Sequence, residues 1–119
     1  MPVVTVSALP PSDRAAIDRC LAAVIQRLAA ALQQDRQGVW AQWVSAEAMH
    51  IGATRRSFDG HCPVVVVRAR AGRHPHVVQL GLRAVAEAVA ESLALPVEDV
   101  WVSWEELAPG RVFAGGGVR

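Results

Sequence analysis

The chain has 119 residues, a length typical of one compact domain. Hydrophobic residues make up 52% of it and charged residues 19%, which excludes intrinsic disorder for the body of the chain. The formal net charge is +1, so there is no general electrostatic attraction to nucleic acid or to an anionic membrane. The basic residues are all arginines, which excludes Schiff-base lysine chemistry and a P-loop lysine.

The N-terminal segment reads MPVVTVSALPPSDR and lacks the basic and then apolar order of a secretory signal. No window approaches the ~20 apolar residues that a transmembrane helix needs. Cys20 and Cys62 have no spacing typical of a disulfide framework or a zinc knuckle, which favours two reduced thiols. We therefore expect a soluble, cytoplasmic protein that binds neither membrane nor nucleic acid and needs no cofactor.

The two halves of the sequence follow the same pattern. Each begins with a proline and a β-branched run, continues with a long amphipathic segment and ends in a Val-Trp strand. Pro2 to Pro63 and Val39 to Val100 both span 61 positions (63 − 2 and 100 − 39). An offset that is constant across a whole unit indicates a duplicated β-α-β unit. We expect one domain over 1–119, with repeat one at about 2–53, a linker at about 54–61 and repeat two at about 62–117.

Periodicity predicts one long helix in each half. Apolar residues recur at steps of three and four, which is typical of one buried helix face. The two sets are Ile17, Leu21, Val24, Leu28 and Leu32, and Val78, Leu82, Val85, Val89 and Leu93. Ser12 is the expected N-cap of the first helix, and Gly38 breaks the pattern after it. Pro75 falls near the first turn of the second helix, where its missing N–H costs nothing.

A strand, a long helix and a strand predict a parallel strand pair with a right-handed crossover. Two such units give an α+β fold, in which a four-stranded mixed sheet carries two helices on one face. The four consecutive valines at 64–67 make the predicted strand apolar on both faces, and the helices can cover only one of them. The other face is too apolar for a soluble monomer, so we expect an oligomer that buries it.

These features, with a proline directly after the initiator methionine, resemble the tautomerase superfamily. The segment Arg70-Ala71-Gly72-Arg73 is similar to the Arg-x-Gly-Arg loop of its chloroacrylic acid dehalogenase members. The resemblance implies a tautomerase or MIF-like fold, a homotrimer, and an isomerase that acts on a small oxo-acid or enol. It implies that Arg70 and Arg73 bind the substrate carboxylate, and it places Ser103 at a substrate-binding position where the dehalogenase has a tyrosine.

The chemistry of Pro2 can also be argued from its residue type. Removal of Met1 would leave a secondary amine, and an α-amino group titrates at roughly 7.7–8.0 in water. Burial and the nearby charges of Arg70 and Arg73 would lower the pKa of this amine, so that it could act as a general base. The arginines would hold a carboxylate or a developing enolate oxygen. We therefore expect Pro2 to be catalytic, with Arg68 as a reserve candidate for anion binding.

Two other functions stay open. Asp35 lies near the position at which malonate semialdehyde decarboxylase carries its aspartate, which favours a lyase of that kind. If Met1 is retained, Pro2 has an amide nitrogen that cannot accept a proton, and the chain would be a non-catalytic trimeric scaffold or small-molecule binder.

A metal site is not expected. His74 and His76, with His61 and Cys62, have no spacing that matches a zinc pattern.

Overall fold

The computed structural model describes residues 2–56 and 62–119, with the backbone alone at 54–56, so most of the predicted linker lies outside the described residues. The first half contains β1 (Val3–Ala8), α1 (Ala15–Leu32), the 3-10 turn η1 (Arg36–Gly38), β2 (Trp40–Ser45), β3 (Met49–Ile51) and β4 (Thr54–Arg56). The second half contains β5 (Val64–Arg70), α2 (Pro75–Leu93), η2 (Val97–Asp99), β6 (Trp101–Leu107), β7 (Phe113–Ala114) and β8 (Gly117–Val118).

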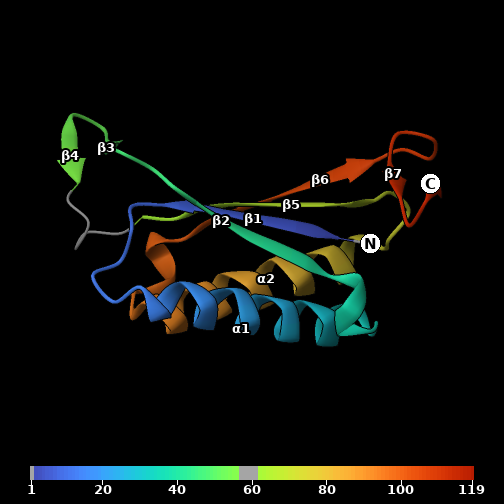
Figure 1. Ribbon diagram of the computed structural model, residues 1–119, viewed down its shortest axis with the longest axis horizontal. Coiled ribbons are helices and arrows are strands. Elements are labelled where there is room, and N and C mark those ends of the chain that lie inside the picture. Colours follow the sequence, from blue (N-terminus) through green and yellow to red (C-terminus); the bar gives the residue numbers. More distant parts are fainter. Residues whose placement is uncertain (1, 57–61) are drawn as a thin grey trace.

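One mixed sheet forms the centre of the molecule, with strand order β2-β1-β5-β6. β1 pairs with β2 and β5 with β6 in parallel, and β1 pairs with β5 in antiparallel orientation. Figure 1 shows α1 and α2 side by side on one face of this sheet. The predicted α+β class, the mixed four-stranded sheet and the placement of the helices are confirmed.

The backbone repeats with the offset found in the sequence. The N–H of Trp40 donates to the carbonyl of Pro2, and the N–H of Trp101 donates to the carbonyl of Pro63, both at 3.0 Å. The helices end at Leu32 and Leu93, each followed by a left-handed residue. The offset is lost in the two hairpins, because β3–β4 and β7–β8 differ in length and position. They lie at opposite ends of the sheet (Figure 1).

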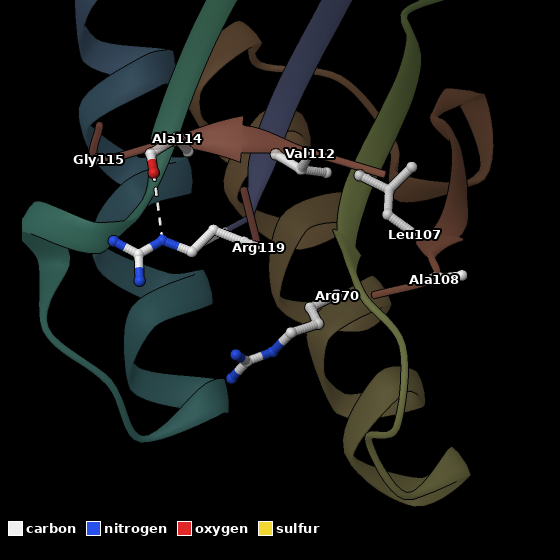
Figure 2. Close-up of a pocket in the computed structure, with 7 residues that line it drawn as sticks. All are labelled: Arg70, Leu107, Ala108, Val112, Ala114, Gly115 and Arg119. Atoms are coloured by element: carbon white, nitrogen blue, oxygen red, sulfur yellow. Dashed lines mark hydrogen bonds between the residues drawn. The ribbon is translucent and has the colours of Figure 1, made fainter. Parts of the chain in front are cut away.

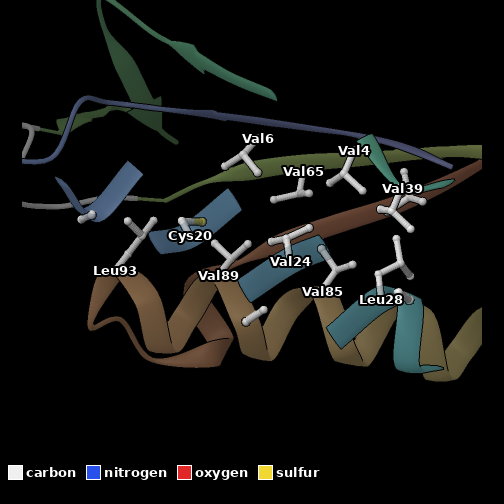
Figure 3. Packing of buried hydrophobic residues seen from close by; sticks show 14 residues of the cluster. Val4, Val6, Cys20, Val24, Leu28, Val39, Val65, Val85, Val89 and Leu93 are labelled. Atoms are coloured by element: carbon white, nitrogen blue, oxygen red, sulfur yellow. The ribbon is translucent and has the colours of Figure 1, made fainter. Parts of the chain in front are cut away.

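The core lies between the sheet and the helices (Figure 3). Alternate residues of β1 and β5 point into it, so that each strand buries every second side chain. The fully buried residues of the two strands and the two helices include Val4, Val6, Val65, Val67, Cys20, Val24, Leu28, Val85 and Val89. Burying a Val or Leu side chain contributes about 1.5–3 kcal/mol, so this layer is the main source of stability.

The start of α1 differs from the prediction. The helix begins at Ala15, and the carboxylate of Asp13 accepts a hydrogen bond from the Ala15 N–H at 3.0 Å. Ser12 is therefore not the N-cap, because Asp13 stands nearer to the free N–H groups and its charge makes it the stronger acceptor. The prediction that Pro75 lies in the first turn of α2 is confirmed. The structure adds that His74 caps this helix, since its Nδ1 accepts from the His76 N–H.

The sheet face opposite the helices is uncovered in the single chain. Trp40 is 55% exposed, Trp101 64% and Val64 36%. They share this face with Arg68 and Glu105, which form an ion pair between neighbouring strands. Gln42 also lies on this face and donates to Thr5, so the face predicted to be apolar is only partly so. Within the residues that the structure describes, no helix is both long and apolar enough to cross a membrane.

Candidate functional site

The start of β1 and the end of β5 meet at one edge of the sheet. Their antiparallel register sets Val3 opposite Arg68, so Pro2 and Arg70 both lie at this edge. The parallel register of β5 and β6 sets Leu107 beside Arg70. Figure 1 shows the N-terminus, the end of β5 and the C-terminal hairpin at the same end of the molecule. The edge therefore brings together segments that are far apart in the sequence.

A cavity of about 260 Å³ opens at this edge between the sheet and the C-terminal hairpin (Figure 2). Its lining consists of Arg70, Leu107, Ala108, Val112, Ala114, Gly115 and Arg119. Two of these side chains are cationic, none is acidic, and the others are small or aliphatic. Such a lining fits a small anion with an apolar body, because the arginines can offer charge-assisted hydrogen bonds to the acidic group.

Arg70 is the predicted site residue that reaches this cavity. It is the last residue of β5 and is exposed. Open α/β sheets bind their ligands at the carboxyl ends of parallel strands, and Arg70 lies at such an end. Within the described residues, the Arg70 side chain forms no ion pair and no hydrogen bond, so its donors are free for a ligand.

Arg73 lies beside Arg70 but does not line the cavity. Its Nη1 donates to the Arg70 carbonyl at 3.2 Å, and its Nη2 donates to Oε1 of Gln34 at 3.3 Å. Burial lowers the pKa of Arg73, the positive charge of Arg70 lowers it further, and Glu106 opposes the shift. The side chain thus joins the loop after β5 to the end of α1, and it fixes the backbone that carries Arg70.

Pro2 lies at the same edge with its ring fully buried, and it is not part of the cavity lining. Its carbonyl is held by the Trp40 N–H. Met1 lies outside the described residues. The structure therefore brings Pro2 to the arginine-bearing edge but not into the wall of the cavity.

Ser103 and Arg68 lie further from the cavity. Ser103 pairs with Val66 from within β6, an edge strand, on the uncovered face of the sheet. The Nε of Arg68 lies 3.0 Å from Oε2 of Glu105, so the guanidinium group is held in an ion pair within the single chain. Neither residue lines the cavity.

Arg119 is the cavity residue that the sequence reasoning missed. Its N–H donates to the Val112 carbonyl and its carbonyl accepts from the Gly110 N–H, both at 2.7 Å. Its Nε donates to the Ala114 carbonyl at 3.1 Å. The one signal in the sequence is the glycine-rich segment 115–117, which indicates a turn but gives no hint that an arginine folds back toward Arg70.

The other candidates have structural roles. The carboxylate of Asp35 accepts from the Gln37 N–H at 2.9 Å and caps η1. Among residues 2–56 and 62–119, no three His, Cys, Asp or Glu side chains come together as a metal site, and His61 lies outside this set. At the positions that precede Arg70 and Arg73 by the repeat offset, the first half has Leu9 and Ser12, so the duplication does not reproduce the arginine loop.

No family model matches the sequence, and no curated protein sequence does. Solved structures, however, are similar over nearly the whole chain. The wild-type F6 fused 4-OT, an asymmetric trimer, has a TM-score of 0.87 at 16% identity, covering 98% of this chain and 94% of that chain. Pt0534 inactivated by 2-oxo-3-pentynoate has a TM-score of 0.84 at 14% identity, with coverage of 98% and 94%.

Macrophage migration inhibitory factor of Toxoplasma gondii is also similar, with a TM-score of 0.75 at 17% identity, covering 98% of this chain and 99% of that chain. At these identities the similarity concerns the fold. The mixed four-stranded sheet with two helices is thus an α+β fold like that of these neighbours. The chain has the fold of the tautomerase and macrophage migration inhibitory factor superfamily, as the resemblance in its sequence predicted.

Proposed function

We propose that this protein is a tautomerase-type isomerase whose general base is the amine of Pro2, freed by removal of Met1, and whose substrate is a small oxo-acid or enol. The observation that carries the proposal is the register of β1 and β5, since it sets Pro2 and Arg70 at one edge of the sheet. The neighbouring cavity has a cationic and otherwise apolar lining, which suits a small acid.

The reaction consists of two proton transfers. From an oxo-acid, the neutral Pro2 nitrogen takes a proton from the carbon next to the carbonyl, and the electron pair of that C–H bond moves to give an enolate. From an enol, it takes the hydroxyl proton, which gives the same enolate. The proton then returns to another carbon or to the oxygen, so atoms and charge balance without a cofactor. The ring of Pro2 restricts the direction of the nitrogen, which favours transfer to one position.

Arg70 is proposed to hold the substrate carboxylate and to stabilise negative charge as it develops on the neighbouring oxygen. Arg73 is proposed to support it: its positive charge lies beside Arg70, and its hydrogen bond to the Arg70 carbonyl fixes that residue. The predicted direct contacts of Arg73 and Ser103 with substrate stay predictions, because neither residue lines the cavity of the single chain.

The protein is further proposed to be a homotrimer that acts in the cytoplasm. The uncovered sheet face carries Trp40, Val64 and Trp101, an apolar set that association would bury. The fused 4-OT with the same fold is a trimer. Cys20 and Cys62 are free thiols, which is typical of a reducing compartment.

The test compares two forms of the same protein, one with Pro2 as the first residue and one that retains Met1. Intact mass identifies each form, and ketonisation of phenylenolpyruvate is followed by its loss of ultraviolet absorbance. The form that begins with Pro2 is expected to be active and the other inactive, because an amide nitrogen does not accept a proton at neutral pH. Equal rates in the two forms would exclude Pro2 as the base.

A further inference from the structure

The cavity at the edge of the sheet is lined by a cationic side chain that the proposed reaction does not use. Arg119 follows β8 at the end of the C-terminal hairpin, whereas Arg70 ends β5. Both line the same cavity of about 260 Å³. Figure 2 shows the two guanidinium groups extending toward the same side of it, with Leu107 on the other side.

The two arginines differ from their neighbours in having free donors. Arg68 is paired with Glu105, and Arg73 donates to the Arg70 carbonyl and to Gln34. Over 2–56 and 62–119, the Arg70 side chain and the two Nη atoms of Arg119 have no hydrogen-bond acceptor and no carboxylate partner. Two like charges that share one cavity repel each other, and a bound anion would remove that cost.

Arg119 is also held in place for such a role. Its backbone is fixed by Val112 and Gly110, and its Nε is bound to the Ala114 carbonyl. The outer Nη groups are then the donors that remain. Gly115 leaves room for these Nη groups because it has no side chain. A Cβ at that position would lie 2.9 Å from Nη2 of Arg119. The hairpin therefore presents a positioned guanidinium rather than a freely moving one.

We propose that Arg119 is a second anion-binding residue and that it converges with Arg70 on one carboxylate of the ligand. The apolar body of that ligand would lie along Leu107 and Val112. Ligand cavities usually measure roughly 300–1,000 Å³, so this one fits a small acid and not a large cofactor. The inference deepens the proposed function, since it concerns the carboxylate that Arg70 is proposed to hold.

The test measures binding of an unreactive acid and of its neutral counterpart, phenylacetate and phenylacetamide, by isothermal titration calorimetry. Arg119→Gln is expected to weaken phenylacetate binding by about tenfold or more, as for other charge-assisted hydrogen bonds, and to leave phenylacetamide binding unchanged. Arg111→Gln is the matched control, because it removes the same charge from the same C-terminal segment at an exposed residue outside the cavity lining.

Convergence on one carboxylate is tested by a double-mutant cycle with Arg70→Gln. If both arginines hold the same carboxylate, their effects on binding are coupled. The fold-loss of phenylacetate affinity in the double variant is then smaller than the product of the fold-losses in the two single variants. The proposal is overturned if the losses multiply independently, if Arg119→Gln behaves like Arg111→Gln, or if the parent binds phenylacetate no better than phenylacetamide. Binding of these probes does not require the Pro2 amine, so failure of the proposed catalysis would leave this result unaffected.

Discussion

Arg68 and Glu105 form an ion pair across β5 and β6, with 3.0 Å between Nε and Oε2. Arg70 lies two residues further along the same strand and on the same face, at its end, without such a partner among the described residues. Two arginines of one strand thus have different environments. One is neutralised within the sheet, and the other faces a cavity.

This difference predicts unequal effects on catalysis. Arg70→Ala should cost about 2–4 kcal/mol of transition-state stabilisation, as for the loss of one oxyanion donor. Arg68→Ala should change the activity much less, because the residue is occupied by Glu105 and a partly exposed ion pair contributes at most about 1 kcal/mol to stability. The measurement is kcat/KM on one oxo-acid for both variants. A larger loss for Arg68→Ala would show that the binding site lies on the sheet face and not at its edge.

Gly115 and Gly116 provide a matched pair of substitutions in the C-terminal hairpin. Both have positive φ, 61° and 82°, so an alanine at either position carries similar backbone strain. Only at Gly115 would the new Cβ meet Arg119, while nothing lies within 4 Å at Gly116. Gly115→Ala is expected to weaken phenylacetate binding beyond any effect of Gly116→Ala. Equal affinities in the two variants would mean that the position of Arg119 does not matter for the anion.

Trp101 is expected to contribute to assembly. It is 64% exposed on the uncovered sheet face, so Trp101→Glu removes little packing from the single chain but places a charge in the proposed interface. Light scattering should give three times the chain mass of 12.7 kDa for the parent and a lower mass for this variant. Leu80→Glu is the control, since Leu80 is 42% exposed on α2, away from that face. A parent that is monomeric at micromolar concentration would rule out the trimer.

Cys20 should make the stability decline at high pH. Burial raises the pKa of its thiol from 9.0 to about 11. The unfolded chain therefore loses this proton first, so the stabilising effect is complete below pH 9 and disappears as the pH rises toward 11. The sequence has neither lysine nor tyrosine, which leaves few other groups that titrate in this range.

Urea unfolding between pH 8 and 11 measures this effect. Cys20→Ala should flatten the decline, and Cys62→Ala should retain it. A decline of the same size in the Cys20→Ala variant would assign it to another group.

The sheet and the helices could be predicted because their signals are regular along the chain. The β-branched runs of β1 and β5, the helical periodicity and the 61-position offset can all be read from residue type along the chain. The residues that α1 buries are harder to predict from the sequence. Ala16, Cys20 and Ala29 are buried, while Ile17 and Leu21 are only partly so, since small side chains allow close packing of this helix face.

The cavity could be predicted only in part. Arg70 could be predicted as a site residue because it lies at the end of a strand, just before the second helix. Arg119 could not be found in this way, because it reaches the cavity through a turn that depends on glycine backbone angles and on two backbone hydrogen bonds. Only the resemblance indicates a binding role for Ser103, and the strand register sets it opposite Val66 within the edge strand β6.

The central claim is that the Pro2 amine transfers the proton, and kcat/KM of Pro2→Ala tests it most directly. With Met1 shown by intact mass to be absent from both proteins, this variant keeps an amine at the same place but loses the ring. General bases contribute about 10²–10⁴-fold, so we expect the rate of phenylenolpyruvate ketonisation to fall by at least about tenfold, with unchanged circular dichroism. Equal kcat/KM for the variant and the parent would contradict the account.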